Sequence, residues 1–342
     1  MGTAADVANR KRHYHSGVLK MTSEEFFLRS LRFVGRRIFS KEYRKEPKLP
    51  LPLDKSGGGE ASALIYETLC KDKPCMITRF GSVELGCVVN YLQLAKKNYK
   101  SIFQYMKGES VCFEWAEKVR FEMNNNAGFF PPTDDNLERF SRLMLECIPN
   151  IDILGSWRLD EILVKEKMPN AKIVDLPDLE PYYHSNPWSR ILKGKTVLVI
   201  HPFAETIKSQ YLKRDKLFLN KEVLPEFKLE TIQAVQSIAN NDCGYKNWFE
   251  ALEAMKLQIS QKEYDVAIIG CGAYGFPLAS FVKDQGKKAV HLGGAVQILF
   301  GIKCRRWDEN PYQSSFYNEY WVRASKEETP KNAELVENAC YW

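Results

Sequence analysis

The sequence predicts an α/β protein with a Rossmann-like, doubly wound, mainly parallel sheet, preceded by a basic amphipathic helix. Three observations predict this. Short apolar runs alternate with helical patterns, glycine or polar residues follow several of the runs, and 342 residues that are 44% hydrophobic can bury a large core. Continuous apolar strands that alternate with helices are typical of a parallel sheet covered on both faces.

The first element expected is a helix in the segment SEEFFLRSLRFVGRRIFSKEYRK, residues 23–45. Apolar residues recur on one helical face (Phe27, Leu31, Val34 and Ile38), and arginines and lysines fill much of the rest. Such a helix can lie on an anionic membrane surface, with its rings at the acyl boundary and its arginines among the head groups. It can equally pack on its own domain with solvated arginines.

An extended linker is expected next. The segment KEPKLPLPLDKSGGGEAS combines prolines, which lack a backbone donor, with a glycine run that is costly to hold in a helix. We therefore place a boundary near residue 58. It separates a basic N-terminal helix and linker, residues 1–58, from an α/β domain, residues 59–342.

Seven strands and five helices are expected in the α/β domain. In a sheet of this class, ligands bind in the crevice beyond the carboxyl ends of the strands, so the residues that end each strand are the candidate site. The expected strands are 74–80, 151–157, 171–177, 195–203, 228–235, 264–272 and 287–294, and the expected helices are 82–97, 134–147, 204–213, 246–260 and 275–285.

Composition excludes some classes of function. The net charge of +6 is mild and spread along the chain, which does not indicate a nucleic-acid partner but permits an anionic substrate or membrane surface. The nine cysteines show no C-x-x-C pair and no zinc-like spacing with histidine. We read them as reduced thiols, and the N-terminal residues lack the apolar core of a signal peptide, so a cytoplasmic location is expected.

A glycine motif ends the strand at 264–272. Gly270, Gly272 and Gly275 have the spacing G-x-G-x-x-G at the start of a helix. A dinucleotide site also needs an acidic residue at the end of the next strand, where this chain has His291. Two interpretations remain: a helix N-terminus that binds phosphate, or glycines that only let helix and strand approach.

The next strand ends in HLGGAVQILFGIKCRRW. Gly293 and Gly294 leave space for a ligand, Gln297 offers a donor and an acceptor, and Arg305 and Arg306 can bind phosphate. Alternatively, the apolar part is a buried helix and the arginines are solvated.

A second candidate follows the strand in CMITRFGSVELGC. Arg79 closes the strand, Gly81 permits a sharp turn, and Ser82 can cap a helix with Glu84 in its first turn. Arg79 can hold a phosphate or carboxylate, and Glu84 can bind a metal or a sugar hydroxyl or act as a base. The alternative is a local cap in which these groups serve only the helix.

Two further strand ends carry polar residues. His201 can contact a diphosphate or an acceptor hydroxyl, or it is a buried, hydrogen-bonded histidine. Asp175, Asp178, Glu180 and His184 lie among aromatic residues, a mixture that suits sugars but also a loop that merely packs.

Two of these segments resemble a known family. RFGSVEL is similar to the R-F-G-D-G-E segment of bacterial glycosyltransferases with the GT-D fold, and VAIIGCGAYGFPLASFVKDQGKKAVHLGGAVQILFG is similar to their late strand, glycine turn, helix and following strand. The resemblance covers residues 74–92 and 264–307. It implies transfer of a sugar from a nucleotide diphosphate sugar, with an Asp-x-Glu pair that helps to bind metal and donor.

This chain departs from the family pattern at Ser82, which replaces the first carboxylate of that pair. A Mn²⁺ or Mg²⁺ site would then have Glu84 as its one acidic ligand, which puts metal dependence in doubt. Arg79 or the Arg305–Arg306 pair could stabilise the leaving diphosphate instead.

We therefore expect a glycosyltransferase that acts on a hydroxyl of a glycan, free or lipid-linked, in polysaccharide synthesis. An NAD-dependent oxidoreductase and a non-catalytic nucleotide-sugar-binding protein are the alternatives. The expected catalytic residues are Glu84, Arg79 and His201, and the expected donor-binding residues are Gly81, Ser82, Gly270, Gly272, Gly275, His291, Gly293, Gly294, Arg305 and Arg306.

Overall fold

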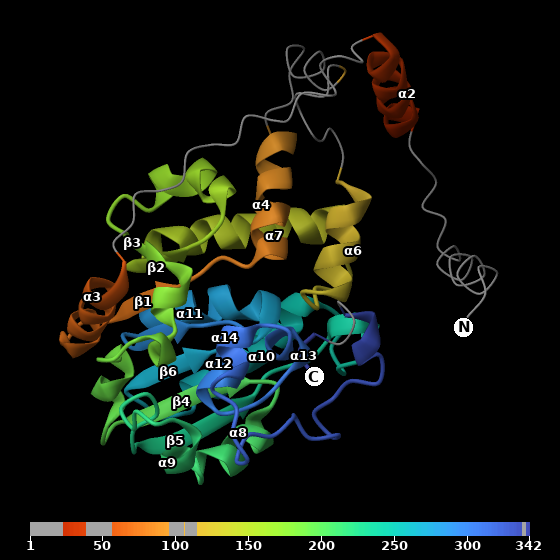
Figure 1. Ribbon diagram of the computed structural model, residues 1–342. Coiled ribbons are helices and arrows are strands. Elements are labelled where there is room, and N and C mark those ends of the chain that lie inside the picture. Colours follow the sequence, from red (N-terminus) through yellow and green to blue (C-terminus); the bar gives the residue numbers. More distant parts are fainter. Residues whose placement is uncertain (1–22, 39–56, 96–105, 107–114, 337–339) are drawn as a thin grey trace. The chain divides into compact units, whose positions relative to one another are not determined.

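The computed structural model describes residues 23–38, 57–95, 106, 115–336 and 340–342 (Figure 1). The chain divides into two compact units, residues 1–48 with 93–114 and residues 49–92 with 115–342. The smaller unit contains helix α2 (Ser23–Ile38), and the larger unit contains the sheet.

A seven-stranded sheet forms the centre of the larger unit, with strand order β3-β2-β1-β7-β6-β4-β5 and every neighbouring pair parallel (Figure 1). This confirms the predicted fold class, and each strand lies inside one of the seven predicted ranges. The strands are β1 (Cys75–Thr78), β2 (Ile153–Ser156), β3 (Lys172–Asp175), β4 (Thr196–His201), β5 (Lys228–Gln233), β6 (Val266–Ile269) and β7 (Lys288–His291).

The strand sequences explain their positions in the sheet. Strands β1 (CMIT), β2 (ILGS) and β6 (VAII) are buried at every residue, as strands covered on both faces must be. Edge strands β3 and β5 expose polar residues, among them Lys172 and Lys228. Charged side chains at sheet edges oppose pairing with other chains.

Helices cover both faces of the sheet (Figure 1). Helix α11 packs on β6, β7 and β1 and contacts α7 and α10, whereas α8 packs on β4 and β5. The crossovers β1–β2 and β6–β7 run in one direction and β4–β5 runs in the other, so right-handed connections place their helices on opposite faces. The helices of the larger unit are α3 (Gly58–Cys70), α4 (Ser82–Leu94), α6 (Glu117–Asn125), α7 (Asp134–Cys147), α8 (Ala204–Tyr211), α9 (Arg214–Leu217), α10 (Trp248–Ser260), α11 (Gly275–Asp284), α12 (Ala295–Leu299), α13 (Arg305–Asp308) and α14 (Pro311–Ser314).

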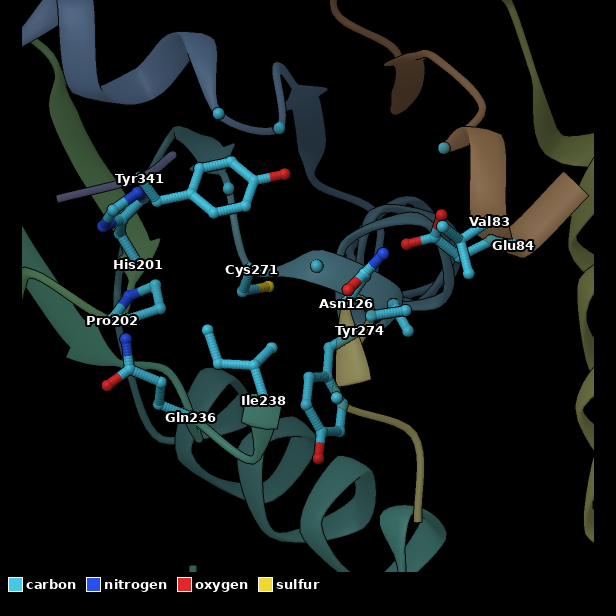
Figure 2. Close-up of a pocket in the computed structure, with 18 of the residues that line it drawn as sticks. Val83, Glu84, Asn126, His201, Pro202, Gln236, Ile238, Cys271, Tyr274 and Tyr341 are labelled. Atoms are coloured by element: carbon cyan, nitrogen blue, oxygen red, sulfur yellow. The ribbon is translucent and has the colours of Figure 1, made fainter. Parts of the chain in front are cut away.

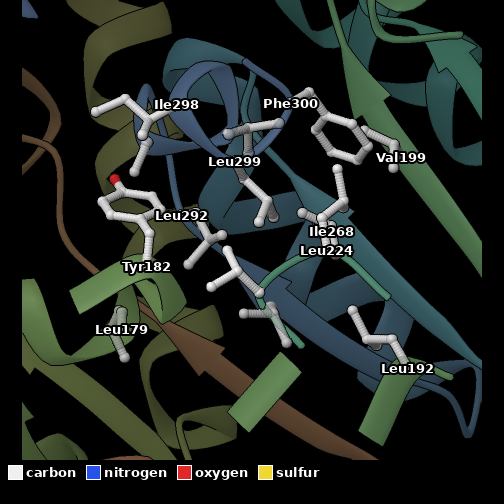
Figure 3. Packing of buried hydrophobic residues seen from close by; sticks show 14 of the residues in the cluster. Leu179, Tyr182, Leu192, Val199, Leu224, Ile268, Leu292, Ile298, Leu299 and Phe300 are labelled. Atoms are coloured by element: carbon white, nitrogen blue, oxygen red, sulfur yellow. The ribbon is translucent and has the colours of Figure 1, made fainter. Parts of the chain in front are cut away.

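The main hydrophobic core lies between the sheet and the helices α3, α8 and α12. Figure 3 shows side chains of α12 packed beside residues of β4 and β6 and of the connection from β3 to β4. The core residues labelled in Figure 3 are Leu179, Tyr182, Leu192, Val199, Leu224, Ile268, Leu292, Ile298, Leu299 and Phe300.

All five predicted helices are present, but the end of the segment predicted as an extended linker was wrong, because Gly58 and Gly59 belong to a helix that we did not predict. Helix α3 begins at Gly58, whose N–H donates to Asp178 Oδ2 at 3.1 Å. Burial of Ala61, Ile65 and Leu69 supports the helix and offsets the low helix propensity of the glycines. The linker residues before 57 and the end of the basic segment, 39–45, lie outside the described residues.

None of the helices in the described part of the chain combines the length and apolar character that crossing a bilayer requires.

Candidate functional site

A cavity of about 370 Å³ opens at the carboxyl end of the sheet (Figure 2). Its walls include the residues that follow β1, β7, β6, β4 and β5. Strands β6 and β4 are neighbours, and the helices that follow them, α11 and α8, lie on opposite faces of the sheet. The loops after such strands diverge and open a crevice, which is the usual ligand site of this architecture. The volume suits a small molecule.

The cavity brings together all of the predicted site residues except Gly275 and Arg305. Gly275 does not line the cavity; it is the first residue of α11 and lies against the His291 ring. The Arg305 side chain is more than half exposed and lies 3.7 Å from Glu309. The roles predicted for these residues stay predictions.

The side chain of Arg79, which follows β1, is held in place by contacts with Phe80 and Trp157. Its Nε donates to the carbonyl oxygen of Phe80 at 3.1 Å, and Trp157 Nε1 donates to the same oxygen at 2.9 Å. The guanidinium carbon lies 4.8 Å from the centre of the Trp157 ring, a cation–π contact. Across the described residues, no protein group bonds the two terminal nitrogens of Arg79, so they can face a ligand.

Glu84 lies in the first turn of α4, and its charge interacts with that of Arg79. Its carboxylate folds back over Gly81, where a side chain would collide with it. Burial raises the pKa of Glu84, against the opposing charge of Arg79. A carboxylate with a raised pKa is a better proton acceptor than an exposed one.

His201 lies across the cavity from Glu84 (Figure 2). The Phe203 N–H donates to its Nδ1 at 3.0 Å, and burial lowers its pKa to about 3. The ring is therefore neutral, and its proton is on Nε2 because Nδ1 is an acceptor. His201 can thus offer an N–H donor to a ligand.

His291 ends β7 and is also neutral. Burial is the largest cause that lowers its pKa to about 3, and the charge of Arg79 adds to it. Its Nδ1 is hydrogen-bonded to Thr78 Oγ1 at 3.0 Å, which joins the ends of β7 and β1. This contact holds the strand end that carries Arg79.

The backbone geometry of the turn after β6 explains why it contains glycines. A side chain on Gly270 would meet the Gly293 carbonyl oxygen, and Gly272 has φ +56°. Three N–H groups of the turn are engaged, because those of Ala273, Tyr274 and Gly275 donate to the carbonyl oxygens of Ala127, Cys271 and Gly272. These contacts favour the packing interpretation of the motif over the phosphate interpretation.

A second cation, Arg306, lies near Arg79. Its charge contributes to a lowered Arg79 pKa, of which burial is the largest cause. The guanidinium lies 4.6 Å from the centre of the Tyr341 ring, and the Arg306 N–H donates to the Cys340 carbonyl at 3.0 Å. The segment Cys340–Trp342 thereby brings Tyr341 and Trp342 to the cavity wall.

The sequence did not point to several wall residues. Trp157 follows β2 and the segment 235–238 follows β5, so both obey the strand-end rule that found the other residues. Residues 126–128 and the pair Tyr341–Trp342 follow no strand, and no sequence pattern marked them as part of a site. The polar loop after β3 does not line the cavity: Tyr182 packs in the core and donates a hydrogen bond to Glu180.

The donor set of the cavity does not fit Mn²⁺ or Mg²⁺ by itself. Glu84 is the one carboxylate among the described residues that line it, and burial disfavours its charged form. Magnesium prefers six oxygen ligands. No group of three or more His, Cys, Asp or Glu side chains is arranged for a metal ion in the described ranges.

Comparisons with protein-family models, curated proteins and solved structures found no match to this chain.

Proposed function

We propose that the protein is a glycosyltransferase that moves a sugar from a nucleotide diphosphate sugar to a glycan hydroxyl. The observation that carries this proposal is Arg79, which lines a cavity at the carboxyl end of the sheet and whose two terminal nitrogens bond no group among the described residues, with Arg306 close by. Two arginines at one site suit a diphosphate. The aromatic walls suit the flat faces of a base or a sugar.

The site residues suggest how transfer would proceed. The acceptor oxygen forms a bond to the anomeric carbon while the bond from that carbon to the diphosphate breaks, and the electron pair leaves with the diphosphate. Glu84 takes the acceptor proton, and Arg79 and Arg306 stabilise the negative charge that develops on the leaving group. The His201 Nε2–H donates a hydrogen bond from the opposite wall.

Of the alternatives, the NAD-dependent oxidoreductase has less support. The strand after the glycine helix ends in a buried neutral histidine instead of an acid, and three N–H groups of the turn are engaged. A non-catalytic binding protein would have the same cavity and is distinguished only by turnover.

The test is release of nucleoside diphosphate from a panel of nucleotide sugars, measured together with their binding. We expect Glu84→Gln to bind the donor within a few-fold of the unmodified protein but to turn it over about 10² to 10⁴ times more slowly, because it keeps the shape and loses the base. Arg79→Lys should weaken donor binding, because lysine cannot hold a phosphate by two parallel bonds.

Glu263→Gln serves as the control, since that side chain is exposed and outside the cavity. Donor binding without turnover in the unmodified protein would favour the non-catalytic alternative. Binding of NAD and of no nucleotide sugar would overturn the proposal.

We further propose that α2 brings a cytoplasmic enzyme to an anionic membrane, where lipid-linked acceptors are made. Phe27 and Phe33 are each 59% exposed, and Val34 and Ile38 are exposed as well. The segment around them is rich in arginine. Such a helix binds by apolar insertion together with attraction to acidic lipids.

Flotation with vesicles tests this second proposal. The full chain should float with phosphatidylcholine vesicles that contain phosphatidylglycerol, and deletion of residues 1–50 or the pair Phe27→Ser and Phe33→Ser should reduce the bound fraction. Equal flotation of all three proteins would contradict it.

A further inference from the structure

Two residues that line the cavity, Gln297 and Trp342, each have a buried polar side-chain atom that bonds no group in the described part of the chain, and the acceptor of the two is on Gln297. Gln297 is 2% exposed and lines the cavity, and its Oε1 bonds no group among the residues that the structure describes. A buried carbonyl oxygen without a hydrogen bond costs about 1 to 3 kcal/mol. Buried polar groups in proteins are otherwise nearly always paired.

The orientation of this amide is fixed. Gln297 Nε2 donates to the Tyr341 carbonyl oxygen at 3.2 Å. The NH₂ group must therefore point to Tyr341, and the oxygen is presented as an acceptor on the other side. A ligand that satisfies this oxygen has to bring an O–H or N–H donor.

The same corner of the cavity contains both arginines. The Tyr341 ring contacts Arg306, and a Cβ at Gly293 would lie 3.6 Å from Arg79 Cδ. Gln297 follows Gly293 by four residues and its side chain donates to Tyr341, so it is linked to a neighbour of each arginine. A diphosphate held by the arginines would lie close to Gln297.

An ionised diphosphate has acceptors only and cannot satisfy a carbonyl oxygen. The nearest donors in a nucleotide diphosphate sugar are the hydroxyls of the two sugars joined to the diphosphate. We infer that Gln297 Oε1 accepts a hydrogen bond from a sugar hydroxyl next to the diphosphate, on the ribose or on the transferred sugar. This inference rests on the proposed function. It makes Gln297 a specificity residue that favours ligands with a hydroxyl at this position.

Calorimetric binding of three probes tests the inference: inorganic pyrophosphate, UDP and UDP-glucose, with GDP and GDP-mannose as a second pair. Gln297→Met keeps the length of the side chain and removes the acceptor. We expect it to bind nucleotide sugar about 10 to 100 times more weakly, with pyrophosphate binding unchanged. A loss shared by UDP and UDP-glucose places the hydroxyl on the ribose, and a loss confined to UDP-glucose places it on the transferred sugar.

Gln258→Met is the matched control, because Gln258 is an exposed glutamine of α10 and does not line the cavity. Nucleotide-sugar binding by Gln297→Met that equals the unmodified protein would overturn the inference and leave the proposed function standing. An equal loss of pyrophosphate binding would overturn it too, because Gln297 would then only support the wall. Failure of every probe to bind the unmodified protein would overturn the proposed function and this inference together.

If Gln297→Met does not fold, analogues of the ligand that lack single hydroxyls test the same inference on the unmodified protein. The unmodified protein is titrated with 2′-deoxy-UDP, 3′-deoxy-UDP and the deoxyglucose analogues of UDP-glucose. At least one analogue should bind about 10 to 100 times more weakly than its parent. Equal binding of all analogues would contradict the role of Gln297.

Discussion

Burial has moved the pKa values of three residues that line the cavity, and of one acid whose charge acts on Arg79 from outside it, away from their ordinary range. Glu84 and Glu180 have raised pKa values, and His201 and His291 have lowered ones. In each case burial is the largest cause, because a low-dielectric environment disfavours the charged form. The acids and the imidazoles therefore affect stability with opposite signs as the pH changes.

Glu180 should make the protein less stable at high pH. Burial raises its pKa to about 7, so the folded state binds its proton more tightly than the unfolded state does. Its stabilising contribution is complete below pH 4.5 and is lost as the pH rises through 7. Glu180→Gln should remove this slope, with a gain over the unmodified protein of up to about 3 kcal/mol at pH 8.

Urea unfolding between pH 4.5 and 8 measures this effect, with the exposed Glu263→Gln as the control. Parallel stability curves for Glu180→Gln and the unmodified protein would show that Glu180 is already ionised at pH 5.

His291 should make the protein less stable at acidic pH. Burial holds its pKa at about 3, so the unfolded state takes up the proton first as the pH falls below 6.5. Its stabilising contribution is present above pH 6.5 and is lost at about 1.4 kcal/mol per pH unit on acidification. His291→Gln, which can still hydrogen-bond Thr78, should reduce the slope between pH 6 and 4 by that amount. A His291 imidazole that titrates near pH 6.5 in NMR spectra would contradict this.

At the scale of elements, the close approach of β6, β7 and the turns that follow them positions the cavity floor. A Cβ at Gly270 would meet the Gly293 carbonyl oxygen and, at 2.8 Å, Val296 Cγ2. At Gly81 it would meet only the carboxylate of Glu84, which is the mobile end of a side chain. The two glycines therefore differ in what a methyl group must displace.

Gly270→Ala should destabilise the fold by a few kcal/mol, because backbone atoms must move. Gly81→Ala should change the free energy of unfolding by less than about 1 kcal/mol and yet lower activity, because it displaces Glu84. Denaturant unfolding of both variants gives the comparison. Equal destabilisation by the two substitutions would refute it.

The elements were largely predictable because their signals are local. Runs such as VLVI in β4 and VAII in β6 identify buried parallel strands, and their ends identified Arg79, His201 and Gly270. Helix α3 was missed because its glycines have low helix propensity, and the packing of Ile65 and Leu69 overrides that preference. Tyr341 and Trp342 were missed because only tertiary contacts bring them to the cavity, through hydrogen bonds to Gln297 and to the first residues of α13.

At the scale of the whole molecule, the larger unit has a protected centre and more exposed sheet edges. Strands β1, β6 and β7 have neighbours on both sides, whereas β3 and β5 each have one. The outer strands also expose more of their residues. Local opening should therefore begin at the edges and leave the strand ends that carry the cavity intact.

Native-state hydrogen exchange measures this order. Amides of β1, β6 and β7 should exchange only through global unfolding, whereas those of β3 should exchange through smaller openings with a lower free energy. Exchange of β3 amides as slow as that of β6 amides would show that the sheet opens as one unit.

The cavity wall joins residues from the beginning of the sheet to the end of the sequence, from Arg79 at β1 to Trp342. The ribosome translates β1 and α4 long before Tyr341 and Trp342. Until then, Gln297 lacks the carbonyl that orients it, and one wall of the cavity is missing. The binding site is therefore complete only after residue 342 has been added, when all seven strands of the sheet have already been translated.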